Sequence, residues 1–276
     1  MASREEWIGR TGTEWARRGA ALELLLDPPS DEGLRVLAPR PGERIIDLGC
    51  GAGPSTARLA ETVTTTGHVL AIDISPDLIA QARERLGGSP QVTIAEADAE
   101  VYDFGAQPYD GLFSRFGAMF FDNPAAALGN VRSALKPGGR AVFVAWREAA
   151  INQWASVPLT FSTDGAAPQG PRSGPGPFAW ADPAVFTGAL EGGGFRQIAA
   201  EPFEYMAEIS EGDDPDPVVR AADFMMRIGP LAAKLRGATP EAKQEAREFL
   251  RHRLARHVSG SAVRLMASAW IITATG

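Results

Sequence analysis

The sequence predicts an α/β fold in which a doubly wound, mostly parallel sheet of seven strands has helices on both of its faces. From about residue 44 onward, short apolar runs rich in β-formers alternate with segments of helical periodicity. Such strand–helix alternation is typical of parallel sheets covered by helices. The 276 residues, of which 45% are hydrophobic and 22% charged, suffice for one large domain.

The first five expected strands are short apolar runs. They cover residues 44–48, 68–73, 92–97, 109–114 and 140–146. Between the second and third runs, apolar residues recur at helical spacing and predict one buried helix face. These residues are Leu78, Ile79, Ala82 and Leu86. Asn123 before Pro124 predicts the start of a later helix, and KPGG at 136–139 predicts its end.

In the C-terminal half of the chain, the composition and the pattern of apolar residues change. Residues 163–178 are rich in Gly and Pro and predict a loop. A helix within 181–195 and a strand from about residue 195 follow. Two or three helices are then expected as a late insertion, one of them with Thr239 as N-cap. Residues 268–275 are expected to form the last strand.

These elements predict one doubly wound domain with a helical cap rather than two independent domains. We expect residues 1–42 to form an N-terminal helical lid segment and residues 43–150 to form the ligand-binding core. Residues 151–276 are expected to complete the same domain, with substrate-cap helices inserted at about 205–262. Within the lid segment, Asp27-Pro28-Pro29-Ser30 is interpreted as a helix-ending turn.

Composition disfavours several functional classes. The formal net charge is −7 and the basic residues are scattered, whereas nucleic-acid binders present a basic face. No apolar run approaches the roughly 20 residues of a membrane span, and the N-terminus lacks a signal-peptide core. The lone cysteine, Cys50, rules out an intrachain disulfide and a multi-cysteine zinc site. We therefore expect a cytoplasmic protein with no metal, nucleic-acid partner or membrane partner.

The stretch 45–55, IIDLGCGAGPS, predicts a sharp turn directly after the first strand. Its three alternating glycines let the backbone approach a ligand and adopt positive φ. Ligands of doubly wound sheets bind at the carboxyl ends of the strands. The second strand ends at Asp73, which suits a ribose diol, and the third ends near Asp98, which can accept from an exocyclic amine.

Two ligand classes compete for this turn. A dinucleotide-binding loop, G-x-G-x-x-G, needs glycine at position 54, where this chain has Pro54. Asp47, just before the turn, would repel a pyrophosphate but would suit an ammonium group. An adenosine with an amino-acid tail and no phosphate accommodates Asp47, Asp73 and Asp98 together. That ligand is S-adenosylmethionine.

The stretch 43–146 resembles a class I S-adenosylmethionine-dependent methyltransferase, whose fold is Rossmann-like. Residues 43–53 match the first motif of that family, and Asp73 matches its ribose-binding acid. Asp98-Ala99 matches the adenine-side pair, and residues 135–139 match the turn before the fifth strand. The similarity is greatest to the ubiquinone/menaquinone-biosynthesis branch, which acts on small molecules.

The resemblance implies a role for the core in binding S-adenosylmethionine and transferring its methyl group by in-line displacement. The acceptor would be a small organic molecule with an N, O or C nucleophile. The implied cofactor-binding residues are Asp47, Gly49, Cys50, Gly51, Gly53, Asp73, Ile74, Asp98, Ala99 and Ser114.

The acceptor pocket is expected between the lid segment, the 115–121 loop, the loop after Trp146 and the late helices. Its candidate residues are Trp7, Trp15, Arg115, Met119, Phe120, Trp146 and Trp154. Aromatic and Met side chains suit a flat or apolar acceptor and can face a sulfonium by cation–π contact. The catalytic residue stays unassigned, with His257 and Tyr205 as candidates for a base.

Other functions stay open at this point. A nicotinamide-dependent oxidoreductase is disfavoured by Pro54 and Asp47. A non-methylating protein that binds S-adenosylmethionine is compatible with the same motifs, because binding motifs do not report turnover. A protein or tRNA methyltransferase is disfavoured by the acidic charge, and by SRFG at 114–117 where several such enzymes carry two prolines.

Overall fold

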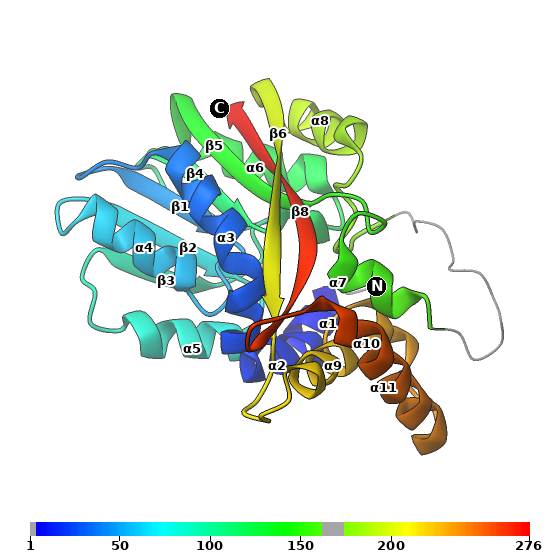
Figure 1. The fold of residues 1–276 in the computed structure, drawn as a ribbon. Coiled ribbons are helices and arrows are strands. Elements are labelled where there is room, and N and C mark those ends of the chain that lie inside the picture. Colours follow the sequence, from blue (N-terminus) through cyan, green and yellow to red (C-terminus); the bar gives the residue numbers. More distant parts are fainter. Residues whose placement is uncertain (1–3, 162–173) are drawn as a thin grey trace.

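The computed structural model describes residues 4–161 and 174–276, which form one mixed sheet with helices packed on it (Figure 1). The strands are β1 (Arg44–Leu48), β2 (His68–Asp73), β3 (Val92–Glu96), β4 (Tyr109–Arg115), β5 (Leu135–Trp146), β6 (Arg196–Ile209), β7 (Val258–Ser259) and β8 (Ala262–Thr275). Seven of them follow the order β3-β2-β1-β4-β5-β8-β6, and the two-residue β7 pairs only with β8. The predicted doubly wound α/β fold is confirmed.

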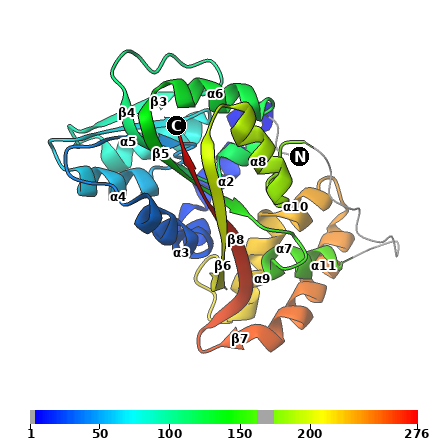
Figure 2. The same cartoon turned by 90° about the horizontal axis from the view of Figure 1, so that it is seen from above.

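The helices cover both faces of this sheet. They are α1 (Arg4–Ile8), α2 (Arg10–Arg17), α3 (Gly19–Leu37), α4 (Pro54–Val63), α5 (Pro76–Leu86), α6 (Pro124–Ser133), α7 (Gln153–Leu159), α8 (Pro183–Gly192), α9 (Pro217–Arg227), α10 (Pro230–Lys234) and α11 (Pro240–Leu254), with 3₁₀ turns η1 (Ala118–Phe120) and η2 (Ala255–His257). Figures 1 and 2 show α3 and α4 on one face and α6 and α8 on the other.

The parallel half of the sheet determines where a ligand can bind. β1 pairs in parallel with β2 and β4, β2 with β3, and β4 with β5. Ile45, Ile46 and Leu48 of β1 are buried by the layers on both faces. Because parallel strands end on the same side, the segments that follow β1, β2, β3 and β4 meet at one edge of the sheet.

The antiparallel half differs from expectation at two boundaries. β8 pairs with both β5 and β6, and its ladder with β6 is continuous from Ala199 to Ile209. The last strand therefore begins at Ala262, earlier than the expected residue 268, because β6 offers it a long partner. The first cap helix begins at Pro217 rather than near residue 205, since that region belongs to β6.

The interpretation of Asp27-Pro28-Pro29-Ser30 as a helix-ending turn is wrong, because α3 continues through both prolines to Leu37. Pro29 has no N–H, so the carbonyl of Leu25 lacks its helical donor. The hydroxyl of Tyr205, in β6, donates a 2.6 Å hydrogen bond to that carbonyl. A distant side chain thus replaces the missing backbone hydrogen bond.

Several local expectations are confirmed. The stripe predicted on α5 is buried in full. Asn123 accepts from the Ala126 N–H at 3.3 Å as the cap of α6, and Thr239 accepts from the Ala242 N–H at 3.3 Å as the cap of α11. α6 ends at Ser133 as KPGG predicts, but 136–139 belongs to an irregular start of β5 rather than to a separate turn.

The helices of the expected cap, α9, α10 and α11, lie together with α7 beyond the β6–β8 end of the sheet (Figure 2). Of the loop expected at 163–178, residues 163–173 lie outside the described ranges, and residues 174–178 form bends and turns. None of the helices within 4–161 and 174–276 is both long and apolar enough to cross a membrane.

Candidate cofactor and acceptor site

The turn after β1 has the backbone conformation that its glycines predict. Gly49 and Gly51 have φ of +69° and +57°. A Cβ on Gly49 would lie 2.9 Å from the Cα of Gly117, so only glycine permits this approach to the segment after β4. A Cβ on Gly51 would instead project into open space, with no atom within 4 Å. The turn therefore leaves an uncovered backbone surface where a ligand can rest.

The segment after β4 is itself strained. Phe116 has φ of +58°, which is uncommon for a bulky side chain. Its ring stacks on Trp146 with the ring centroids 4.3 Å apart, and both rings are buried. This stacking holds Phe116 in its left-handed conformation and places Gly117 against the glycine turn.

Asp73 connects the ends of β1 and β2. Its carboxylate accepts the Gly51 N–H and the Ser75 N–H, each at 2.9 Å. Burial raises the pKa of Asp73, while these backbone hydrogen bonds oppose the rise. The side chain is therefore a positioned acceptor beside the glycine turn.

Asp98, at the end of β3, is also held by its surroundings. One carboxylate oxygen accepts the Glu100 N–H at 2.9 Å, and the other pairs with Arg4 Nε at 3.2 Å. Arg4 belongs to α1, so this ion pair fastens the lid segment to the core.

These groups surround a cavity of about 240 Å³ at the carboxyl edge of the parallel strands. Seven of the ten predicted cofactor residues line it: Gly49, Cys50, Gly51, Asp73, Ile74, Asp98 and Ala99. Burial raises the pKa of the Cys50 thiol well above its usual value, and the nearby carboxylates of Asp73 and Asp47 add to the rise. Cys50 therefore contributes a neutral surface rather than a nucleophile.

Asp47, Gly53 and Ser114 do not line the cavity. Asp47 is fully buried, and one of its oxygens accepts from Ser55 Oγ at 2.8 Å and Thr56 Oγ1 at 2.6 Å. Its other oxygen has no hydrogen-bond partner among the described residues. Burial raises the pKa of Asp47, while the two hydroxyls oppose the rise.

Ser114 and Gly53 support the cavity from behind. The hydroxyl of Ser114 donates to the Leu48 carbonyl at 2.9 Å, which joins β4 to the end of β1. Gly53 has φ of +80°, and a Cβ there would lie 2.9 Å from Leu86 Cδ1. Both residues fix the backbone of the glycine turn without reaching its open side.

Four of the seven predicted acceptor residues line the cavity: Trp7, Trp15, Arg115 and Phe120. The ring of Trp7 meets the ring of Trp15 edge-on with centroids 5.2 Å apart, and it meets that of Phe120 at 5.0 Å. These rings form an aromatic row that joins the lid segment to η1 across the cavity.

Met119, Trp146 and Trp154 do not line the cavity, because each is packed in the core. The indole N–H of Trp154 donates to Asn152 Oδ1 at 3.1 Å, and its ring packs on that of Trp146. Trp146 contacts Phe116, which does line the cavity. The prediction of direct acceptor contact by these three residues is therefore corrected.

Sequence reasoning missed wall residues contributed by the lid segment. Arg4, Gly19, Leu22, Glu23 and Leu26 all line the cavity. The run AALELLL at 20–26 places a single acid among apolar residues. This pattern was the sequence signal that the helix could face both the core and a polar site.

The two candidate bases lie elsewhere. Tyr205 does not line the cavity, and its hydroxyl is already bound to Leu25, while burial raises its pKa well above the ordinary value. His257 follows α11 in η2 and is likewise absent from the cavity wall. Burial, followed by Arg256 and Arg253, lowers the pKa of His257. Neither residue is placed to accept a proton from an acceptor in this cavity.

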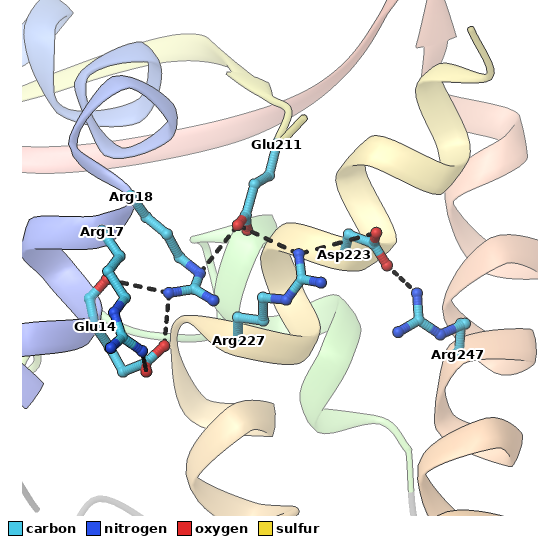
Figure 3. A network of polar contacts seen from close by, with 7 residues as sticks. All are labelled: Glu14, Arg17, Arg18, Glu211, Asp223, Arg227 and Arg247. Atoms are coloured by element: carbon cyan, nitrogen blue, oxygen red, sulfur yellow. Dashed lines mark hydrogen bonds and ion pairs between the residues drawn. The ribbon is translucent and has the colours of Figure 1, made fainter. Parts of the chain in front are cut away.

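A polar network connects the lid segment to the cap (Figure 3). Arg18, at the junction of α2 and α3, pairs with Glu14 at 2.6 Å and with Glu211 at 3.0 Å. Glu211 also pairs with Arg227 of α9 at 3.3 Å. Asp223 continues the network from α9 to Arg247 of α11. Because several partly buried charges take part, the network holds lid and cap together better than isolated surface pairs could.

Comparison with known proteins agrees with this geometry. Residues 45–139 match the sequence family described as "Methyltransferase domain". A demethylmenaquinone methyltransferase of Clavibacter sepedonicus is 38% identical over 108 residues, which cover 39% of this chain and 43% of that protein. This chain thus aligns with less than half the length of that relative.

Solved structures share the fold over most of the chain. The YcgJ protein of Bacillus subtilis has a TM-score of 0.56 at 13% identity, covering 90% of this chain and 98% of that one. Phosphoethanolamine N-methyltransferase 2 of Haemonchus contortus, in complex with S-adenosyl-L-methionine, has a TM-score of 0.51 at 17% identity. It covers 89% of this chain and 51% of that one. With the glycine turn, the paired acids and the matched segment together, residues 45–139 are similar to a methyltransferase domain, and the chain resembles the ubiquinone/menaquinone-biosynthesis methyltransferases over that part of its length.

Proposed function

We propose that this protein transfers a methyl group from S-adenosylmethionine to a nucleophilic N, O or C atom of a small organic acceptor. The observation that carries this proposal is the convergence of the open glycine turn, Asp73 and Asp98 on one cavity. The residues present fit the cofactor, because the space that a Cβ of Gly51 would fill lies free at the cavity wall.

The cofactor roles follow from this arrangement. The backbone of Gly49 and Gly51 would lie against the methionine part, and Asp73 would accept the ribose hydroxyls with the lone pairs that its backbone donors leave free. Asp98 and Ala99 would border the adenine, with Ile74 packing beside it. The unpartnered oxygen of Asp47 adds negative charge behind the turn, which suits a cationic ligand.

S-adenosylmethionine supplies a methyl group on a positively charged sulfur. When bound, it would give that methyl group to the nucleophilic atom of the acceptor and leave as the neutral thioether S-adenosylhomocysteine. Because positive charge leaves the sulfur, a site that excludes water and positions the acceptor in line favours the reaction. Trp7, Trp15 and Phe120 would exclude water, and their faces would favour a cation nearby.

The acceptor is proposed to be a small molecule rather than a nucleic acid, and the site of action to be the cytoplasm. The net charge of −7 supports the first point, since it disfavours binding to phosphate backbones. The lone cysteine supports the second, because disulfide-dependent stability is not available to this chain.

Release of S-adenosylhomocysteine tests the proposal. The purified protein is incubated with S-adenosylmethionine and with phenols, carboxylates, amines, N-heterocycles, thiols and quinols in separate reactions. Turnover confined to one group supports the proposal and fixes the reaction class. Binding of S-adenosylhomocysteine with no turnover across the panel would argue against a small acceptor, and tight binding of NADH in its place would argue against the cofactor.

A further inference from the structure

A second cavity, of about 220 Å³, lies between the lid segment and the cap. Its walls come from α2 on one side and from the end of α9 and the start of α10 on the other. Trp15 lines both this cavity and the cofactor cavity, so the two spaces meet at the same side chain. A ligand that reaches from one cavity into the other would lie against Trp15.

The wall of this cavity has an excess of positive charge. Arg10, Arg227 and Arg236 line it, whereas Glu14 is the one acid of the described residues on the wall. The charge of Glu14 is already compensated by Arg18 at 2.6 Å and by Arg17 at 3.5 Å (Figure 3). The excess is unusual in a chain with a net charge of −7.

The three arginines differ in how far they are engaged. Arg236 pairs with Glu6 at 2.6 Å, and Arg227 pairs with Glu211 at 3.3 Å. Arg10 forms no ion pair with any residue in the described part of the chain, and its side chain lies on the exposed face of α2. Arg10 therefore has all five N–H donors free to bind an anion.

We propose that this cavity binds an anionic group of the acceptor, a carboxylate or a phosphate, and that it thereby selects acidic acceptors. The planar guanidinium groups match both anions with paired hydrogen bonds. The apolar body of the acceptor runs past Trp15 along the aromatic row toward the cofactor cavity, where its nucleophile meets the methyl group. This inference rests on the proposed function, because it names the acceptor class of that reaction.

Calorimetric titration of benzoate, phenyl phosphate and the neutral benzamide tests the inference directly. Each probe is titrated into the protein with and without saturating S-adenosylhomocysteine. We expect saturable binding of benzoate, of phenyl phosphate or of both, and no comparable binding of benzamide. The anion that binds distinguishes a carboxylate preference from a phosphate preference.

Variants at two exposed arginines separate the effect of the cavity from that of surface charge. Arg10→Gln is expected to weaken anion binding about tenfold, which is the usual effect of losing one charged hydrogen-bond donor. Arg10→Lys should retain most of the affinity. Arg40→Gln, at an exposed arginine that lines neither cavity, should bind the anions as the wild type does.

Three results would each overturn the inference: benzamide binding as tightly as the anions, no anion binding, or equal affinities of Arg10→Gln and wild type. Affinity for S-adenosylhomocysteine, measured in the same samples, keeps the two proposals apart. Loss of that affinity counts against the proposed function, whereas intact affinity without anion binding counts against the acidic acceptor alone.

Discussion

The hydroxyl of Tyr205 donates a 2.6 Å hydrogen bond to the backbone carbonyl of Leu25, 180 residues away in the chain. That carbonyl lacks a helical donor because Pro29 stands four residues later. β6 thereby fixes the course of α3, whose first half contributes Leu22, Glu23 and Leu26 to the cavity wall. A residue that was a candidate base is thus a structural support for the lid segment.

Tyr205→Phe is expected to lower the free energy of unfolding by about 1–2 kcal/mol, because it leaves a buried carbonyl without a donor. Urea unfolding followed by circular dichroism measures the change. Tyr102→Phe is the control, since the Tyr102 hydroxyl makes no hydrogen bond within the described part of the chain. An unchanged stability of Tyr205→Phe would contradict the structural role, and a pH-dependent loss of turnover at full stability would restore it as a base.

Gly51→Ala and Gly138→Ala form a matched pair. Both glycines have positive φ, and a Cβ on either would meet no atom within 4 Å, so both substitutions should cost about 1 kcal/mol of stability. Only Gly51 lines the cofactor cavity. We expect Gly51→Ala to weaken S-adenosylhomocysteine binding at least about fivefold, which corresponds to about 1 kcal/mol, and Gly138→Ala to leave it unchanged. Equal affinities in the two variants would remove the glycine turn from the binding site.

The contact of Gly12 with Ser75, the residue before α5, should hold the lid segment in place. A Cβ on Gly12 would lie 2.2 Å from Ser75 Oγ and 2.3 Å from the Trp7 carbonyl, so Gly12→Ala should displace α1 and α2. Limited proteolysis should then cut the lid segment faster, and affinity for S-adenosylhomocysteine should fall, because Trp7 leaves the cavity wall.

Gly188→Ala supplies the control for the lid. Gly188 lies in α8 with nothing within 4 Å of its Cβ position, so the substitution should stabilise the helix by about 0.5–1 kcal/mol. Proteolysis of the lid at the wild-type rate in Gly12→Ala would show that the lid does not depend on this contact.

Asp47 should leave a signature in the pH dependence of stability. Its pKa in the folded protein is raised above 3.8 by burial, so the folded state binds more protons than the unfolded state as the pH rises from 3.8 to the folded pKa. Stability therefore falls as the pH rises through that window. Asp47→Asn lacks this titration and keeps an oxygen for Ser55 and Thr56.

The stability of Asp47→Asn relative to wild type should consequently grow as the pH rises from about 3.8, and the difference should level off once Asp47 of the wild type is ionised. Chemical unfolding at pH 3.5, 5 and 7 measures the difference, with the exposed Asp103→Asn as reference for the amide substitution. A difference that stays constant across these pH values would refute the raised pKa.

The parts of the site that follow from local patterns could be predicted from the sequence. A strand followed by alternating glycines predicts both the turn at 49–53 and its place at the sheet edge. Asp73 and Asp98 could be placed because one ends β2 and the other closely follows β3, and the carboxyl ends of these strands meet. The buried stripe of α5 follows from its helical period in the same way.

The parts that depend on distant contacts could not be predicted. The two prolines look like a stop signal until Tyr205 is known to supply the missing donor. Trp146 was an acceptor candidate because it is aromatic and precedes a loop expected at the pocket, but its ring is buried and stacks on the left-handed Phe116, which lines the cavity instead. Arg4 and Glu23 reach the wall only because α1, α2 and α3 fold back over the core.

Binding of S-adenosylhomocysteine to wild type and Asp73→Ala tests the central claim most directly. Calorimetry should show saturable binding by the wild type, and at least about tenfold weaker binding by Asp73→Ala, because a positioned carboxylate acceptor is lost. Asp103→Ala, at an exposed turn outside the cavity wall, should bind as the wild type does. No binding by the wild type, or equal affinity of wild type and Asp73→Ala, would contradict the assignment of this cavity to S-adenosylmethionine.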